Sequence, residues 1–143
     1  MNGTLYIVGT PIGNLGDMTF RAVEILRSVD FIAAEDTRVT HKLLSHFKID
    51  KKMISYFEHN KRERGQIIIN RIKNKENCAL VTDAGMPAIS DPGEMIVRQC
   101  YDERIDVKVI PGPSACISAL SVSGLPTGRF SFEGFLSVNK KGR

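Results

Sequence analysis

Residues 5–17 read LYIVGTPIGNLGD, a short apolar run that leads directly into a turn rich in Gly and Pro. Two further stretches repeat the arrangement: residues 79–93 read ALVTDAGMPAISDPG, and residues 107–115 read VKVIPGPSA. The apolar runs predict buried strands at Leu5 to Val8, Ala79 to Thr82 and Val107 to Ile110. In an open parallel sheet the ligand crevice lies beyond the carboxyl ends of the strands, so we expect the three loops to converge on one pocket.

Helical patterns alternate with strand patterns along the rest of the chain. Five helices are expected. The first follows a Thr19 cap, the second spans about Val39 to Phe47 and the third about Arg62 to Asn74. The fourth starts at Asp91-Pro92 with Asp91 as cap, and the fifth covers Ala115 to Val122, where small residues suit close packing on a sheet. Further strands are expected at Phe31 to Ala34, Met53 to Phe57 and about Arg129 to Phe135. This alternation predicts a three-layer α/β/α domain with a mostly parallel sheet.

Composition is that of an ordinary globular protein. The 143 residues are 42% hydrophobic and 25% charged, with a net charge of +4 that suits a polyanionic partner but is common among proteins without one. No stretch approaches the ~20 apolar residues that span a bilayer, and the start lacks the features of a secretory signal, so we expect a cytoplasmic location and no membrane association. Cys78, Cys100 and Cys116 lack metal-ligand spacing, which predicts buried free thiols and no metal.

Several common catalytic motifs are missing. Gly9, Gly13 and Gly16 are spaced more widely than the dinucleotide-binding pattern requires, and no Walker A loop, Gly-x-Ser-x-Gly elbow or zincin motif occurs. The remaining interpretation is a pocket walled by backbone that Pro holds in place, suited to a neutral or zwitterionic ligand bound by main-chain groups.

Five stretches in series resemble the tetrapyrrole methylase superfamily, and within it most closely the ribosomal RNA small subunit methyltransferase I subgroup. They are residues 5–17, AEDTR at 34–38, DAGMPAISDPG at 83–93, IPGPSA at 110–115 and GLPTGRFSFEGFL at 124–136. The resemblance implies an S-adenosylmethionine-dependent enzyme that methylates the ribose 2′-oxygen of a cytidine in small-subunit ribosomal RNA. It also implies a homodimer of chains with two α/β domains, with the cofactor in the cleft between the domains.

Only the first of those two domains is matched by this sequence. We therefore expect an N-terminal methylase-like domain over residues 1–136, a disordered basic tail over residues 137–143, no second domain, and little or no activity from the chain alone. Two alternatives remain open: a methyltransferase acting on a tetrapyrrole carbon, and a non-catalytic RNA-binding or dimerisation module.

The resemblance also suggests cofactor-contacting positions. Carried over position by position, they fall on Ala84-Gly85-Met86-Pro87, on Ser114-Ala115 and on Pro11. Met86 stands where the broader family often has Asp in a Gly-Gly-Asp-Pro run, so a carboxylate contact there is not expected. The hydroxyl of Ser114 suits a helix cap as well as a ligand contact.

Methyl transfer to a ribose hydroxyl is helped by a base, because an unactivated hydroxyl is a poor nucleophile. Asp36, Glu35 and Asp83 are the candidate bases, and each also suits a loop hydrogen bond or a salt bridge. Arg38 is a candidate for holding a phosphate or for pairing with Asp36.

Basic residues in the middle of the chain are candidate RNA contacts. Lys61, Arg62 and Arg64 are placed to follow phosphates, although such runs also form ordinary solvated faces. Tyr56 and Phe57 lie close by in sequence and suit either base stacking or the core of a strand.

Overall fold

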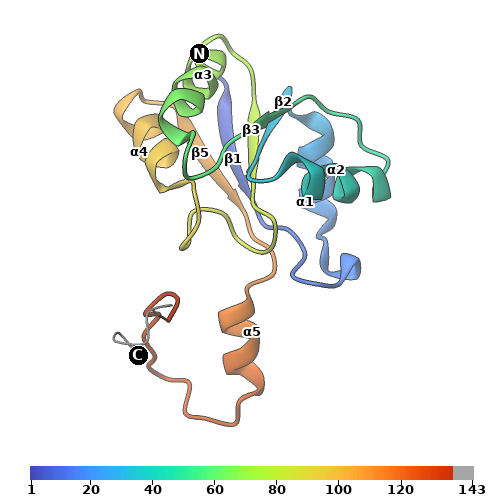
Figure 1. Cartoon of the computed structure of the whole chain (residues 1–143), viewed down its shortest axis with the longest axis vertical. Helices are drawn as coiled ribbons and strands as arrows, with labels where there is room; N and C mark the ends of the chain where they lie inside the picture. The colour runs from blue at the N-terminus through green and yellow to red at the C-terminus, as the bar shows by residue number, and fades with distance from the viewer. Residues whose placement is uncertain (137–143) are drawn as a thin grey trace.

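The computed structural model describes residues 1–136, which form one parallel sheet with helices on both faces, followed by a helix that extends away from the sheet (Figure 1). The sheet order is β3-β2-β4-β1-β5. The strands are β1 (Thr4–Val8), β2 (Phe31–Ala34), β3 (Met53–Ser55), β4 (Cys78–Val81) and β5 (Asp106–Ile110). The helices are the short 3-10 helix η1 (Leu15–Asp17), α1 (Phe20–Ser28), α2 (Thr37–His46), α3 (Lys61–Lys73), α4 (Glu94–Asp102) and α5 (Ala115–Val122).

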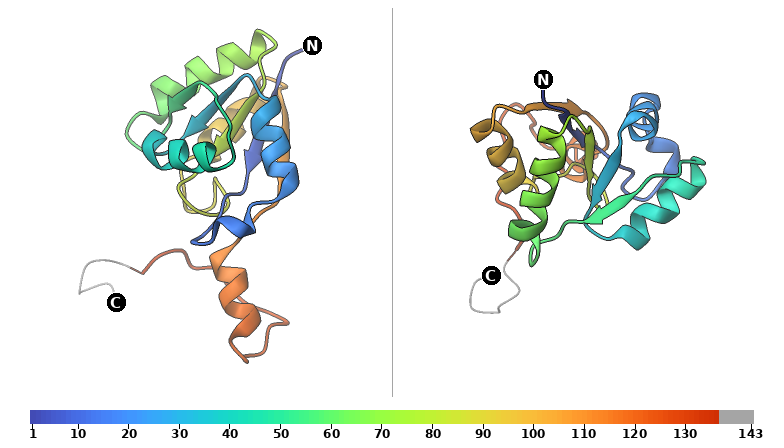
Figure 2. Two further views of the ribbon diagram at one scale, coloured as in Figure 1. Left: turned by 90° about the vertical axis from the view of Figure 1, so that its right-hand side faces the viewer. Right: turned by 90° about the horizontal axis from the view of Figure 1, so that it is seen from above.

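The two faces of the sheet are covered by different helix pairs. Helices α1 and α2 pack on one face through Leu26 and Leu44, and α3 and α4 pack on the other through Ile69 and Ile96 (Figure 2). Strands β2 and β4 are buried along their whole length because they are central in the sheet and covered on both faces. The predicted three-layer α/β/α fold is confirmed.

Local sequence explains most of the boundaries. Thr19 caps α1 as predicted, with its hydroxyl accepting a hydrogen bond from the Ala22 N–H, and Ser28 ends the helix. The apolar side of α3 is buried through Ile68, Ile69 and Ile72, also as predicted. None of the helices within residues 1–136 is long and apolar enough to cross a membrane.

Strands β1, β4 and β5 are neighbours in the sheet, with β1 paired to both β4 and β5 in parallel register. The three Gly- and Pro-rich loops therefore leave the same edge of the sheet from adjacent strands. The carboxyl end of β2, which leads into Glu35 and Asp36, lies next to the end of β4. The topology brings all four predicted site segments to one edge.

The start of α4 was predicted wrongly. The helix begins at Glu94, with Gly93 at its N-cap, so Asp91 does not cap it and Pro92 lies before its first turn. Ala88 and Ser90 both have left-handed backbone angles, with φ of 68° and 53°, which keep the chain out of a helical path at this point. The Asp91 carboxylate is used elsewhere, in the network described below.

The end of the described chain also differs from the prediction. Helix α5 forms at the predicted residues, but it does not pack on the sheet and none of its residues is buried (Figure 1). Its small apolar residues lie all round the helix, so no single stripe directs it onto the sheet, and Pro111 and Pro113 lead the chain beyond the sheet edge. The strand predicted near residues 129–135 is irregular backbone, because no neighbouring strand pairs with it there.

The cysteine prediction holds for two of three positions. All three thiols are free, and Cys78 and Cys100 are buried, but Cys116 is exposed because α5 leaves the sheet. The tail predicted to be disordered, residues 137–143, lies outside the described residues.

Candidate functional site

The three loops meet at Gly9, directly after β1. A Cβ atom added to Gly9 would lie 2.7 Å from the Gly112 Cα of the third loop and 2.7 Å from the Met86 Sδ of the second. Glycine is therefore required here by close approach of backbone to backbone. One residue on, Thr10 and Gly85 exchange two backbone hydrogen bonds, of 3.0 and 3.1 Å, which join the first loop to the second.

A cavity of about 500 Å³ opens between these loops, the start of α5 and the chain that follows it. Its lining includes five of the predicted cofactor contacts: Ala84, Gly85, Met86, Ser114 and Ala115. Gly85 has a φ of 85°, a backbone angle that favours glycine, and this turn exposes its neighbours to the cavity. The structure thus brings together residues of the second and third loops, as the sequence predicted.

Two predicted cofactor positions lie elsewhere. Pro11 lines an adjoining cavity of about 360 Å³ between the first loop and α2. Pro87 is buried and is not among the residues that line either of these cavities. Proline at position 87 acts on the shape of the turn, since its ring fixes φ and it donates no backbone hydrogen bond.

Sequence reasoning missed much of the cavity wall. The additional lining residues are Ile12, Thr82, Ile89, Asp91, Cys116, Phe132 and Phe135. Ile12 and Ile89 are apolar residues inside polar turns and are both exposed, a pattern that could have marked them as ligand contacts. Phe132 and Phe135 could not be found in this way, because their alternation with polar residues resembles a strand.

The carboxylates of the site are joined through Thr82. Its hydroxyl lies 2.7 Å from Glu35 Oε2 and 2.9 Å from Asp91 Oδ2, while Glu35 Oε2 also accepts the Asp83 N–H at 3.3 Å. Burial, together with the Glu35 charge, raises the pKa of both Asp91 and Asp83 above the ordinary value. A hydroxyl has one hydrogen to donate, so at any moment the Thr82 hydroxyl donates either to Glu35 or to Asp91.

Asp36 differs from the other two candidate bases. Its carboxylate accepts hydrogen bonds from the Arg38 backbone N–H at 2.9 Å and from the Arg38 guanidinium at 2.8 and 3.1 Å. These bonds lower the pKa of Asp36 to about 2. A carboxylate with so low a pKa is a weak base, whereas the raised pKa of Asp83 suits proton abstraction. Asp36 is also not among the residues that line the 500 Å³ cavity, while Glu35 and Asp83 are.

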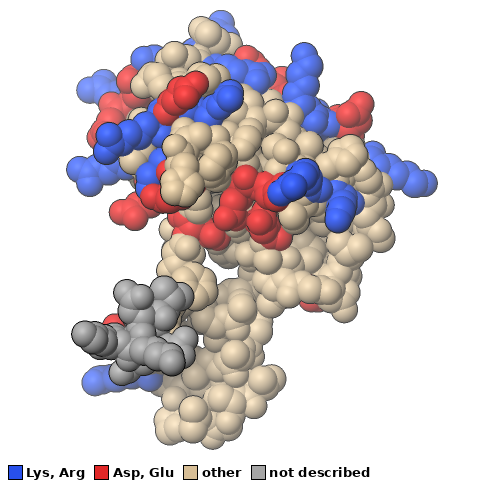
Figure 3. Space-filling view, in the orientation of Figure 1, with Lys and Arg blue, Asp and Glu red and all other residues tan. Residues whose placement is uncertain are grey.

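The predicted RNA-contacting residues do not form one cluster. Arg38 is paired with Asp36 on α2, and Lys61 is paired with Glu58 at 2.5 Å at the start of α3. Arg62 and Arg64 are exposed on α3. Basic side chains gather over the upper part of the domain, while acidic side chains gather at the middle of the visible face, above α5 (Figure 3).

The two aromatic residues considered for base stacking, Tyr56 and Phe57, differ in burial. Tyr56 belongs to the core and is 1% exposed, whereas Phe57 is 37% exposed.

Within residues 1–136, no group of three or more His, Cys, Asp or Glu side chains is arranged to hold a metal ion.

The charge of the 500 Å³ cavity favours a particular class of ligand. Glu35, Asp83 and Asp91 line it, and none of the described lining residues is Lys or Arg. Isoleucine and phenylalanine side chains supply apolar surface beside the carboxylates. The arrangement suits a ligand that carries positive charge together with apolar or aromatic parts.

Comparison with known proteins gives a consistent result. The sequence profile of the Tetrapyrrole (Corrin/Porphyrin) Methylases matches residues 4–142. The chain is 56% identical to ribosomal RNA small subunit methyltransferase I of Synechocystis sp. over 99% of this chain and 50% of the relative. It is 50% identical to the protein of the same description from Escherichia coli O157:H7, over 99% of this chain and 49% of that relative. The chain therefore spans about half the length of the curated relatives it matches.

Solved structures share the fold at lower identity. A conserved hypothetical protein from Aeropyrum pernix K1 superposes with a TM-score of 0.74 at 20% identity, covering 92% of this chain and 46% of that one. A uroporphyrin-III-C-methyltransferase from Thermus thermophilus superposes with a TM-score of 0.65 at 21% identity, covering 88% of this chain and 55% of that one.

Proposed function

This chain belongs to the tetrapyrrole (corrin/porphyrin) methylase family, and from that premise we propose that it is the N-terminal half of an S-adenosylmethionine-dependent RNA methyltransferase. The methyl group goes to the ribose 2′-oxygen of a cytidine in small-subunit ribosomal RNA. The observation that carries the cofactor assignment is the 500 Å³ cavity with three carboxylates and no described cationic side chain. S-adenosylmethionine carries positive charge at its sulfonium and ammonium groups and negative charge at one carboxylate, so its net positive charge is attracted by such a lining.

RNA is a better substrate for this proposal than a tetrapyrrole. The relatives that are 50% or more identical over nearly the whole chain are described as ribosomal RNA methyltransferases. The uroporphyrin methyltransferase is only 21% identical, a level that supports a shared fold alone. The proposed protein acts in the cytoplasm as a homodimer, without a metal ion.

We assign the cofactor-binding role to Gly85, Met86, Ser114 and Ala115. Gly85 is assigned to bring backbone close to the ligand, and Ser114 and Ala115 line the cavity at the start of α5, where the first N–H groups have no partner within the helix. Bound S-adenosylmethionine supplies the electrophilic methyl group. Asp83 is the proposed base for the ribose hydroxyl, since burial and the neighbouring Glu35 raise its pKa.

Residues 1–136 correspond in this proposal to one of two domains, because the relatives are about twice as long as this chain. The cofactor would then contact both domains. Binding by this chain is expected to be weaker than binding by a full-length relative, and catalysis is expected to need residues of the second half.

Calorimetric titration of S-adenosylmethionine and S-adenosylhomocysteine into this chain tests the cofactor site. Ala115→Leu adds bulk inside the cavity, and we expect it to weaken binding by about tenfold or more. The matched control is Ala119→Leu, which adds the same side chain one turn later on α5, outside the lining. Saturable binding that Ala115→Leu leaves unchanged would disprove the placement of the site. Binding of RNA without any binding of either cofactor would favour the non-catalytic module.

A further inference from the structure

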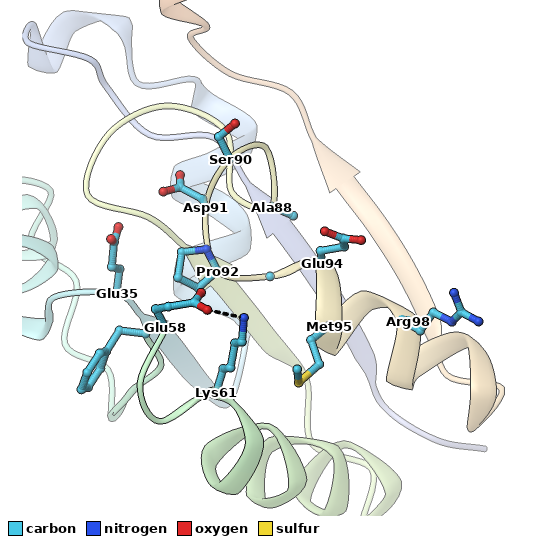
Figure 4. Close-up of a pocket in the computed structure, with 12 residues that line it drawn as sticks. Glu35, Glu58, Lys61, Ala88, Ser90, Asp91, Pro92, Glu94, Met95 and Arg98 are labelled. Atoms are coloured by element: carbon cyan, nitrogen blue, oxygen red, sulfur yellow. Dashed lines mark hydrogen bonds and ion pairs between the residues drawn. The ribbon is translucent and has the colours of Figure 1, made fainter. Parts of the chain in front are cut away.

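A second, larger cavity of about 810 Å³ lies on the α3 and α4 side of the site. The starts of α3 and α4 and the loops after β3 and β4 surround it, and all of its charged side chains are labelled in Figure 4. Its lining residues are Glu35, Phe57, Glu58, Lys61, Ala88, Ser90, Asp91, Pro92, Gly93, Glu94, Met95 and Arg98. Of these residues, only Glu35 and Asp91 also line the cavity proposed for the cofactor.

The two cavities share a wall. Glu35 and Asp91 line both of them, and the Thr82 hydroxyl stands between the two carboxylates at 2.7 and 2.9 Å. A ligand in the larger cavity can therefore present one end at this wall, beside the smaller cavity. A nucleoside has a suitable shape for this, because its ribose is joined directly to a flat base.

The lining chemistry selects among ligands. The lining includes four carboxylates, from Glu35, Glu58, Asp91 and Glu94, and two cations, from Lys61 and Arg98. Lys61 is already paired with Glu58, as the dashed line in Figure 4 marks. This excess of acceptors disfavours a phosphate and favours a group that donates several hydrogen bonds. Carboxylates accept hydrogen bonds from the exocyclic amine of cytosine, which uracil lacks.

An aromatic side chain and nearby basic residues complete the arrangement. Phe57 lines the cavity and is 37% exposed, so part of its ring surface is free to stack on a base. Arg62 and Arg64 are exposed in the first turn of α3, directly after Lys61 in the chain. They can contact RNA phosphates outside the acidic lining.

We propose that the 810 Å³ cavity holds the base of an unpaired cytidine in single-stranded RNA, with Phe57 stacked on the base and a carboxylate of the lining, from Glu58 or Glu94, accepting a hydrogen bond from its amine. The proposal rests on the proposed function for the identity of the RNA, and it adds the place where the target base binds. The ribose of that cytidine lies at the shared wall formed by Glu35 and Asp91, next to the methyl donor, and its 2′-hydroxyl is directed into the 500 Å³ cavity, which Asp83 lines beside Glu35.

Fluorescence anisotropy with two labelled nine-nucleotide RNAs tests this directly. One probe is oligouridine, and the other carries a single central cytidine. We expect this chain to bind the cytidine probe about tenfold more tightly, since one well-made base contact discriminates by about that factor or more. Phe57→Ala should weaken the cytidine probe at least about fivefold.

The double variant Glu58→Ala/Glu94→Ala should lose the preference for cytidine over uridine. Its matched control is Glu24→Ala/Glu63→Ala, which removes the same charge from exposed helix positions outside the cavity and should retain the preference. Equal affinity of the unmodified chain for both probes would overturn the proposal. So would a full preference for cytidine in the Glu58→Ala/Glu94→Ala variant.

Calorimetry with S-adenosylhomocysteine on the same proteins separates this proposal from the cofactor assignment. A cytidine preference that depends on Glu58 and Glu94 in a chain that binds no cofactor would support the base site and count against the cofactor site. Cofactor binding without any cytidine preference would support the cofactor site and overturn the base site.

Discussion

Gly9→Ala should destabilise the domain because Gly9 is the point where three loops cross. The added Cβ would lie 2.7 Å from Gly112 Cα, 2.7 Å from Met86 Sδ and 2.8 Å from Gly112 N. Carbon atoms pack best at about 3.5 to 4.0 Å, so the loops must separate by roughly 1 Å. The thioether of Met86 can rotate away, but the Gly112 backbone can move only with the end of β5.

The cost can be assembled from known magnitudes. Overpacking of this kind costs about 1–3 kcal/mol, and weakening the 3.0 Å hydrogen bond from the Gly9 N–H to the Ile110 carbonyl costs about 1 kcal/mol more. Alanine has less backbone freedom than glycine in the unfolded chain, and this offsets about 0.4–1 kcal/mol of the destabilisation. We expect the free energy of unfolding to fall by about 1–4 kcal/mol.

Urea unfolding followed by circular dichroism measures this change, with Gly128→Ala as the control. A Cβ at Gly128 would meet nothing within 4 Å, so that variant should unfold at the same urea concentration as the unmodified protein. Calorimetry should also show weaker cofactor binding by Gly9→Ala, because the loops that line the cavity move apart. Equal unfolding midpoints for the two variants would refute the crossing as a packing constraint.

Two further predictions concern ionisable groups. Arg38 holds the pKa of Asp36 at about 2, below its ordinary value of 3.8, so the pair stabilises the fold above about pH 4 and loses this contribution as the pH falls toward 2. The urea midpoint of Asp36→Asn should therefore fall less than that of the unmodified protein between about pH 5 and pH 2.5. An equal fall in both proteins would contradict this. N-ethylmaleimide should label only Cys116 in the native protein, as counted by intact mass, because Cys78 and Cys100 are buried and burial raises the pKa of both thiols, that of Cys100 to about 12. Cofactor bound in the 500 Å³ cavity should slow this labelling, and a rate unaffected by saturating S-adenosylhomocysteine would place the cofactor away from Cys116.

Helix α4 illustrates where local interpretation fails. Asp91-Pro92 is a good local helix start, yet Asp91 contacts the Thr82 hydroxyl at 2.9 Å and the helix begins at Glu94. The tertiary contact prevails because it satisfies a partly buried carboxylate, whereas a cap at this point would leave the Thr82 hydroxyl with fewer partners. The hydrogen bonds that join Glu35, Thr82 and Asp91 were not predicted either, because they too depend on tertiary contacts.

Helix α5 shows a different limit. Its residues were predicted correctly, because helix formation depends on propensity and on neighbours three or four positions away. Its packing was predicted wrongly, because small apolar residues do not specify which surface they contact. The position of Cys116 in the cavity wall, rather than in the core, follows from that packing.

The sequence by itself determined the order of strands and helices, the parallel α/β class and the three loops at the sheet edge, because each depends on patterns within a few residues. The tertiary structure alone decided which loop atoms touch. Thr10 and Gly85 pair although they are 75 positions apart, and Gly9 meets Gly112 because β1 lies between β4 and β5 in the sheet. Strand order and register set such contacts, and no short window of sequence contains them.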